Sequence, residues 1–386
     1  MNAIDLPFFP TDQFDEDREV LVDLVRRIGL APSQRFILGE QTARFEELLR
    51  AELGAADVVA CGSGTSALTL ILRAMDIGPG DEIVVPAFGC APLASAPVSV
   101  GATPVFADVD PWTMVADPTA VEAAITPRTR AIMPAHIFSV LADMPAMRRI
   151  AGRHSLRLVE DSAVAQGAVL DGVPAGRWGD AGVFSFVQVK SFGGPGEGGV
   201  VVTGDAELGA AVRMLRNHGQ DGARRFVHHR IGYNSRFDEL LAAFQIHRHP
   251  TLGRRLDRRA RIAEYYTDRF ATLADHGVLA PPPGRAGRCY YVYTLLARQR
   301  DELRDHLAAQ GIGSHAYYPL PLPAQPAFAR FAAVGQRWPA ADQASARALS
   351  IPVYPQLRDA DVERIADAVC AFVGRSVSPE RIGARP

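Results

Sequence analysis

Lys190 is the residue whose type and setting point most directly to chemistry. Lysine and arginine together number 41 in this chain, and Lys190 is the only lysine among them. It follows the apolar run 184–189 and precedes the segment 191–199, which contains five glycines. A lysine at the end of a buried strand can lose its proton and form a Schiff base. The alternative is a loop lysine that faces water, but an arginine-rich chain that keeps one lysine indicates amine chemistry that a guanidinium cannot perform.

Asp161 is a second candidate, because it ends the predicted strand 156–161. A carboxylate at this position could keep the pyridine nitrogen of pyridoxal phosphate protonated, which turns the ring into an electron sink. The alternatives are a helix N-cap or a metal ligand. Glu160 beside it should point to the opposite face of the strand.

Gly64, Thr65 and Ser66 lie where a predicted strand, 57–61, meets a predicted helix, 64–75. A helix start with small residues offers free N–H groups and hydroxyls to a phosphate. The same segment also matches the dinucleotide pattern G-x-G-x-x-A, with Asp81 following Gly62 at the spacing of a ribose-binding acid. That alternative leaves Asp161 and Lys190 without a role.

The elements that must position these residues alternate between strands and helices. This alternation predicts an α/β fold with a mostly parallel sheet and helices on both faces, whose ligands sit beyond the carboxyl ends of the strands. The predicted strands are 57–61, 81–86, 103–109, 130–136, 156–161, 181–187 and 198–203. The predicted helices are 12–30, 41–53, 64–75, 92–101, 116–125, 143–154, 206–217 and 238–273.

Two domains are predicted from this pattern. Residues 1–250 form a large domain with an N-terminal helical segment, and residues 251–386 form a smaller α+β domain. The smaller domain contains the Pro/Gly-rich connector 280–288, a strand over 290–297 and helices over 300–311 and 359–374.

Composition excludes several classes of protein. With a formal net charge of −2, the chain has no overall positive charge that would attract nucleic acid or an anionic membrane. The four cysteines are far apart and form neither a disulfide framework nor a metal site. The first 20 residues lack the pattern of a signal peptide, and no run of apolar residues is long enough to span a membrane. We therefore expect a cytoplasmic protein with no bound metal.

The phosphate-binding segment, the acid and the lysine occur in an order that resembles the DegT/DnrJ/EryC1/StrS aminotransferases. The resemblance covers nearly the whole chain and implies a fold-type-I transferase that uses pyridoxal 5′-phosphate, in a family that acts mostly on keto-sugars. The segments that carry it include GSGTSAL (62–68), GDEIVVPAF (80–88), GATPVFADVD (101–110), VEDSAVAQGA (159–168), GVFSFVQVKSFGGPGEGGVVVT (182–203), GYNSRFDELLAAF (232–244), GIGSHAYYPLPL (311–322) and LSIPVYPQL (349–357).

Carried over position by position, the resemblance implies that Lys190 forms the Schiff base and that Asp161 pairs with the pyridine nitrogen. Gly64, Thr65 and Ser185 would bind the phosphate. Asn234 would reach the cofactor phosphate of the neighbouring subunit, so that a homodimer shares its active sites; alternatively Asn234 is a turn residue. The residues expected near the cofactor ring or the substrate are Cys90, Val164, His136, Tyr317 and Tyr318. As a lone histidine, His136 could equally be a packed structural one.

Three positions depart from the family pattern. Cys90 stands where the family usually has an aromatic ring stacked on the cofactor, although Phe88 could fill part of that space. Val164 replaces a polar residue, and Pro323 replaces a histidine that commonly helps to hold the sugar nucleotide. These changes suggest an acceptor smaller or less charged than a nucleotide-sugar, such as a free cyclitol or a polyol ketone, unless an arginine such as Arg236 substitutes for the histidine.

We therefore expect an aminotransferase that moves an amino group from an amino acid, glutamate or glutamine, to a ketone on a sugar, cyclitol or related small molecule. One alternative is a lyase or dehydratase of the same family, although dehydratases of this family replace the lysine with histidine or add a cysteine cluster. The other alternative is a non-catalytic regulatory relative.

Overall fold

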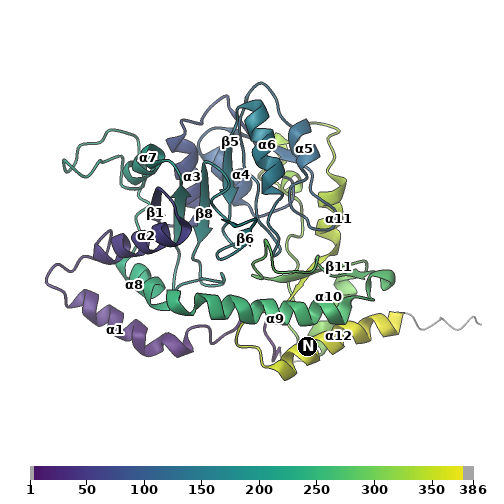
Figure 1. Ribbon diagram of the computed structural model, residues 1–386. Coiled ribbons are helices and arrows are strands. Elements are labelled where there is room, and N and C mark those ends of the chain that lie inside the picture. Colours follow the sequence, from purple (N-terminus) through teal and green to yellow (C-terminus); the bar gives the residue numbers. More distant parts are fainter. Residues whose placement is uncertain (1–3, 377–386) are drawn as a thin grey trace, which may run out of the picture.

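A seven-stranded sheet forms the centre of the protein. The computed structural model describes residues 4–376, and Figure 1 shows the sheet enclosed by helices. The strand order is β1-β9-β8-β5-β4-β2-β3, and only β9 runs antiparallel to its two neighbours. The strands are β1 (Asp57–Cys61), β2 (Glu82–Pro86), β3 (Thr103–Ala107), β4 (Thr129–Ile132), β5 (Arg157–Asp161), β8 (Ala181–Ser185) and β9 (Gly199–Thr203). This arrangement confirms the predicted mostly parallel sheet.

Side chains alternate between the two faces of the sheet, and each face is covered by helices. On β1, Val59 and Cys61 pack in the core formed with α3 and α7, whereas Val58 and Ala60 pack in the core formed with α2 and α8. The helices of this part are α1 (Arg18–Gly29), α2 (Glu40–Leu53), α3 (Gly64–Ala74), α4 (Pro92–Ser99), α5 (Pro118–Ala123), α6 (Met144–His154), α7 (Ala206–Arg216) and α8 (Glu239–Arg248). Because successive side chains of a strand point to opposite faces, both faces of the sheet are apolar and both are covered by helices, as predicted.

A smaller antiparallel sheet lies in the C-terminal part of the chain, in the order β10-β11-β12. Leu6, near the N-terminus, packs in the same core as these strands and forms a bridge with Ile312. The elements are α9 (Leu252–Phe270), β10 (Val278–Leu279), β11 (Tyr293–Ala297), α10 (Arg300–Ala309), α11 (Pro339–Arg347), β12 (Ala348–Ile351) and α12 (Asp359–Ser376). The short hairpin β6 (Val169–Leu170) and β7 (Val173–Pro174) completes the strands. The domain boundary at residue 250 stays a proposal.

The predicted helix over 238–273 is wrong as a single element. It is broken into α8 and α9 by a turn of 3₁₀ helix, His249–Thr251. Pro250 lies inside this turn and cannot donate the backbone hydrogen bond that a continuous helix needs. Figure 1 shows α9 continuing from this break along the edge of the molecule toward the C-terminal elements.

Candidate active site

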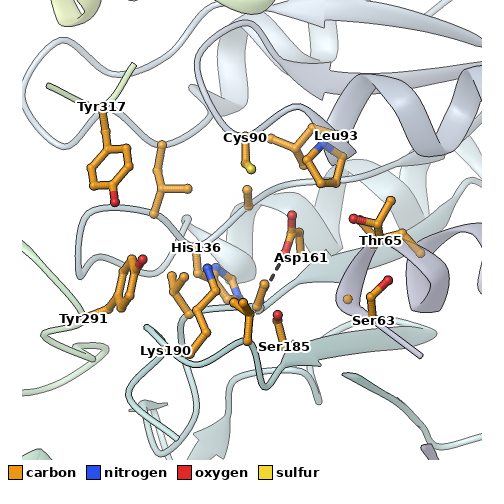
Figure 2. A pocket seen from close by; sticks show the side chains of 18 of the residues that line it. Ser63, Thr65, Cys90, Leu93, His136, Asp161, Ser185, Lys190, Tyr291 and Tyr317 are labelled. Carbon is orange, nitrogen blue, oxygen red and sulfur yellow. Dashed lines mark hydrogen bonds between the residues drawn. The ribbon is translucent and has the colours of Figure 1, made fainter. Parts of the chain in front are cut away.

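A cavity of about 220 Å³ lies at the carboxyl ends of β5 and β8. Its walls come from segments far apart in the sequence, and Figure 2 shows Lys190, Asp161 and Thr65 around one space. The predicted site residues that line it are Gly64, Thr65, Cys90, His136, Asp161, Val164, Ser185, Lys190, Tyr317 and Tyr318. Of the predicted site residues, only Asn234 is not among the residues that line this cavity.

Asp161 is the last residue of β5, and its side chain is buried. One carboxylate oxygen, Oδ1, accepts a hydrogen bond of 3.1 Å from the backbone N–H of Ala163. Burial raises the pKa of Asp161, while this hydrogen bond and the positive charge of Lys190 act in the opposite direction. A buried carboxylate with one backbone donor has room to accept a charged donor from a bound molecule.

Lys190 lies in the turn that follows β8, where its backbone N–H donates to the carbonyl of Val187 at 2.9 Å. Its side chain reaches the cavity. Desolvation lowers the pKa of Lys190, whereas negative charge on Cys90, Asp161 and Glu197 raises it. A desolvated amine of this kind is a better nucleophile than a lysine in water.

The start of α3 forms another part of the cavity wall. Ser63 caps the helix, because its hydroxyl accepts a hydrogen bond of 3.0 Å from the N–H of Ser66. The backbone N–H groups of Gly64 and Thr65 precede the first intrahelical bond and have no acceptor within the described part of the chain. Together with the Ser185 hydroxyl they offer a donor set for a phosphate.

These three features fit the three parts of pyridoxal phosphate. The helix start matches its phosphate, the buried Asp161 carboxylate matches its pyridine nitrogen, and the Lys190 amine matches its aldehyde. The chemistry of the donors supports this fit, because each group has a capacity that the chain's own contacts do not use.

A buried ion pair holds the end of β1, the strand that leads into α3. Arg216 on α7 donates to the carboxylate of Glu46 on α2 and to the carbonyl of Ala60 on β1. Glu46 also accepts a hydrogen bond of 2.9 Å from the N–H of Ala60. The end of β1, from which the phosphate-binding segment begins, is thus fixed by charged groups on two helices.

His136 lines the cavity, but both of its ring nitrogens have partners. Nδ1 accepts from the N–H of Ala142 at 3.2 Å, so in the neutral ring Nε2 carries the proton and donates to Glu160, also at 3.2 Å. Glu160 further accepts from the backbone N–H groups of Gly176, Trp178 and Gly179. These contacts favour a packed structural histidine over a substrate donor, and they place Glu160 away from the cavity, as expected.

The three departures from the family pattern have different settings. Cys90 and Val164 line the cavity, as does Tyr318. Pro323 is buried in a 3₁₀ turn, Leu322–Ala324, and is not among the residues that line the cavity. Pro323 therefore does not change the wall of this cavity directly, and the effect of the missing histidine on the acceptor stays a prediction.

Asn234 lies outside the cavity. Its side-chain amide oxygen, Oδ1, accepts a hydrogen bond of 3.0 Å from Nε of Arg236, and its backbone pairs with that of Asn217. These contacts are compatible with a turn residue and with a residue that serves another subunit, so its role stays a prediction.

Two ionisable residues that line the cavity, Tyr291 and Glu197, escaped the sequence analysis. Tyr291 lies just before β11, within the predicted strand 290–297, where no motif drew attention to a single residue. Glu197 lies in the glycine-rich segment after Lys190 and could have been singled out as its only acid. Among residues 4–376, no group of three or more potential ligand side chains could hold a metal ion.

The fold and this arrangement define a fold-type-I enzyme that uses pyridoxal phosphate. Residues 21–370 match the DegT/DnrJ/EryC1/StrS aminotransferase family. The chain is 42% identical over 336 residues to the UDP-N-acetyl-3-dehydro-alpha-D-glucosamine 3-aminotransferase of Acidithiobacillus ferrooxidans, covering 86% of this chain and 89% of that protein. It is 39% identical to a pleiotropic regulatory protein of Geobacillus stearothermophilus, covering 88% of this chain and 91% of that protein.

A solved structure gives the same result. DesV of S. venezuelae, determined in complex with a ketimine intermediate, superposes with a TM-score of 0.89 at 36% identity, covering 95% of this chain and 99% of that chain. The chain belongs to the DegT/DnrJ/EryC1/StrS aminotransferase family and is a pyridoxal-phosphate-dependent aminotransferase. The predicted family, fold class, enzyme class and cofactor are thereby confirmed.

Proposed function

We propose that this aminotransferase takes an amino group from glutamate or glutamine and delivers it to the ring ketone of a nucleotide-linked keto-sugar. The observation that carries the proposal is the convergence of Lys190, Asp161 and the free amides of Gly64 and Thr65 on one cavity. The name of the Acidithiobacillus relative, which specifies a UDP-linked 3-keto-sugar, supports the choice of acceptor.

Each residue has a separate task in this proposal. Pyridoxal phosphate, when bound, withdraws electrons from the carbon next to the amino nitrogen and so makes its proton acidic. Lys190 would hold the cofactor and shuttle that proton within each half-reaction, as a base when it takes the proton from one carbon and as an acid when it returns the proton to another. Asp161 would keep the pyridine nitrogen protonated, and the amides of Gly64 and Thr65 would anchor the phosphate.

The walls around these groups are largely apolar, with Leu68, Leu93 and Phe138 among the residues that line the cavity. An apolar wall excludes water, which would otherwise hydrolyse the link between the cofactor and the lysine. It also strengthens the attraction between Asp161 and a protonated ring nitrogen.

We further propose that the enzyme is a cytoplasmic homodimer in which Asn234 completes the site of the neighbouring subunit. The segment before Asn234 supports this, because Phe226 is 71% exposed and Ile231 is 84% exposed, as expected of apolar side chains that a second copy covers. None of the described helices, which lie between residues 4 and 376, is both long enough and apolar enough to cross a membrane.

Mixed dimers test the role of Asn234. A Lys190→Ala chain and an Asn234→Ala chain, each inactive or impaired alone, should form mixed dimers that regain one complete site. If Asn234 instead serves its own subunit, mixing the two chains restores no activity.

A second acceptor class is favoured by one observation. Lys190 is the only lysine or arginine among the residues that line the cavity, so a single subunit offers few charges to a diphosphate. This favours a free cyclitol or polyol ketone. Competition kinetics separates the two proposals: a UDP-linked 3-keto-sugar should show a much higher kcat/KM than any free keto-polyol, and the reverse order would replace the nucleotide-linked acceptor with the free one.

The two remaining alternatives, a lyase and a non-catalytic regulator, have no residue in their favour. The lysine that the dehydratases of this family replace is present, and its amine reaches the cavity. Purified protein that shows no absorbance band of lysine-bound pyridoxal phosphate would support a non-catalytic role.

A further inference from the structure

Tyr291 is the aromatic side chain that lies against the amine of Lys190. The Lys190 Nζ atom is 4.7 Å from the centre of the Tyr291 ring, within the range of a cation–π contact. Tyr291 precedes β11 and reaches the cavity from the C-terminal part of the chain, whereas Lys190 follows β8 of the central sheet. Figure 2 shows the two side chains next to each other at one end of the cavity.

The backbone of Tyr291 is fixed by a buried arginine. Arg259 on α9 donates through one nitrogen to the carbonyls of Tyr290 at 3.3 Å and Tyr291 at 3.2 Å, and also to the carbonyl of Val353. Arg259 is buried and has no carboxylate partner in the described part of the chain. Its charge is therefore directed at backbone carbonyls that determine where Tyr291 lies.

The ring of Tyr291 also has aromatic neighbours. Its hydroxyl faces that of Tyr317, as Figure 2 shows. The ring of Phe9, from the N-terminal segment, packs against it with 6.2 Å between the ring centres. A ring restrained by its backbone and by a neighbouring ring cannot turn away from Lys190 without breaking these contacts.

We propose that Tyr291 is a positioning residue for Lys190, whose ring keeps the amine directed into the cavity and favours its ammonium form. The attraction exists only for the charged amine, because the negative face of the ring acts on a positive charge. The inference rests on the proposed function in one respect, namely that Lys190 is the group that moves the proton.

The other groups that face the amine come from three further segments. Asp161 ends β5, Cys90 follows β2, and Glu197 lies in the loop before β9; negative charge on each raises the pKa of Lys190, and desolvation lowers it. Tyr291 adds a contribution that favours the ammonium form without adding a second charge. It thereby offsets part of the desolvation that lowers the pKa of the amine.

The single lysine makes the protonation of this amine measurable without turnover. The full-length enzyme is loaded with pyridoxamine phosphate, which leaves the lysine amine free, and is labelled with a small anhydride at a series of pH values. Peptide mass spectrometry then separates the Lys190 product from the product at the N-terminal amine. The pH at which the labelling rate is half its maximum reports the protonation of Lys190.

Three variants separate the ring from other effects. Tyr291→Leu removes the ring, Tyr291→Phe keeps the ring but removes the hydroxyl, and Tyr265→Leu makes the same change at a partly buried position of the C-terminal core. We expect Tyr291→Leu to label roughly two- to fivefold faster than wild type below the midpoint, because less of its amine is protonated. Tyr291→Phe and Tyr265→Leu should keep the wild-type midpoint.

A Tyr291→Leu midpoint equal to that of wild type would overturn the proposal. So would a Tyr291→Phe variant that shifts as far as Tyr291→Leu, because the effect would then belong to the hydroxyl and not to the ring. If Tyr291→Leu does not fold, the ¹³C resonances of Lys190 are titrated in wild type and in Tyr291→Phe. Unequal titration midpoints would refute the role given to the ring, and equal midpoints would support it. Loss of turnover plays no part in these outcomes, so a failure of the proposed function is recognised separately.

Discussion

A Cβ atom placed on Gly64 would lie 3.0 Å from Cβ of Ser185. The first turn of α3 therefore lies so close to the end of β8 that the side chain of Ser185 fills the space between them and leaves almost none for a side chain at position 64. This approach brings the amides of Gly64 and Thr65 and the hydroxyl of Ser185 to the same cavity. The wall formed by Gly64, Thr65 and Ser185, here called the phosphate-binding wall, requires glycine at position 64 because of this short distance. The φ angle of Gly64 is not the reason for this requirement.

Gly64→Ala should weaken the binding of pyridoxal phosphate roughly tenfold, because Ser185 and the start of α3 must move apart to admit the methyl group. Equilibrium dialysis or cofactor fluorescence measures this affinity. The matched control is Gly152→Ala on α6, where a Cβ atom would meet nothing within 4 Å. An unchanged cofactor affinity in Gly64→Ala would contradict the role given to this wall.

Asp161→Asn should reduce the rates of both half-reactions roughly 100- to 1000-fold while changing cofactor affinity less than about tenfold. The amide cannot balance a protonated pyridine nitrogen, but the phosphate contacts remain. Stopped-flow spectroscopy gives the half-reaction rates, and titration gives the affinity. Nearly normal rates in the Asn variant would refute the pairing of Asp161 with the cofactor ring.

The same substitution should stabilise the cofactor-free protein at neutral pH. Burial raises the pKa of Asp161 in the folded chain, so the stability that this group contributes is complete below the pKa of the unfolded carboxyl and is lost as the pH rises through the folded pKa. The amide side chain of the Asp161→Asn variant carries no charge and loses nothing over that range. The excess Tm of the cofactor-free variant over wild type should thus grow from acidic to neutral pH; a gap that shrinks over that range would contradict this sign.

Glu46→Ala should destabilise the protein by about 3–5 kcal/mol, because it leaves the buried Arg216 without its carboxylate. Glu47→Ala is the matched control on the same helix: Glu47 pairs with Arg50 at the surface, so its loss should destabilise the protein far less. Urea denaturation measures both. Equal effects of the two substitutions would show that the ion pair behind the phosphate-binding wall adds nothing to stability.

Much of the fold can be predicted from the sequence because its signals are local. Apolar runs and helical periodicity identify the seven strands of the central sheet, and the break at Pro250 could have been inferred from the missing N–H of proline. The strand β12 is harder to identify, since its four residues carry no alternation, and it is defined by pairing with β11.

The candidate site divides in a similar way. Lys190, Asp161 and Gly64 stand at the ends of predicted elements, where the strand-end rule locates a ligand. Tyr291 could not be found this way, because its place at the cavity depends on how α9 and β11 pack, and specifically on the carbonyl contacts of Arg259. The engagement of both ring nitrogens of His136 is likewise a tertiary property.

Reductive trapping of the cofactor tests the central claim, that Lys190 holds pyridoxal phosphate, most directly. Borohydride treatment of the loaded enzyme makes the link between the aldehyde and an amine permanent, and peptide mass spectrometry locates it. The account predicts a phosphopyridoxyl group on the peptide that contains Lys190, and no such group in Lys190→Arg, which keeps the charge but cannot form the link. A modification found only at the N-terminal amine, or a loaded wild-type enzyme with no modification of Lys190, would contradict it.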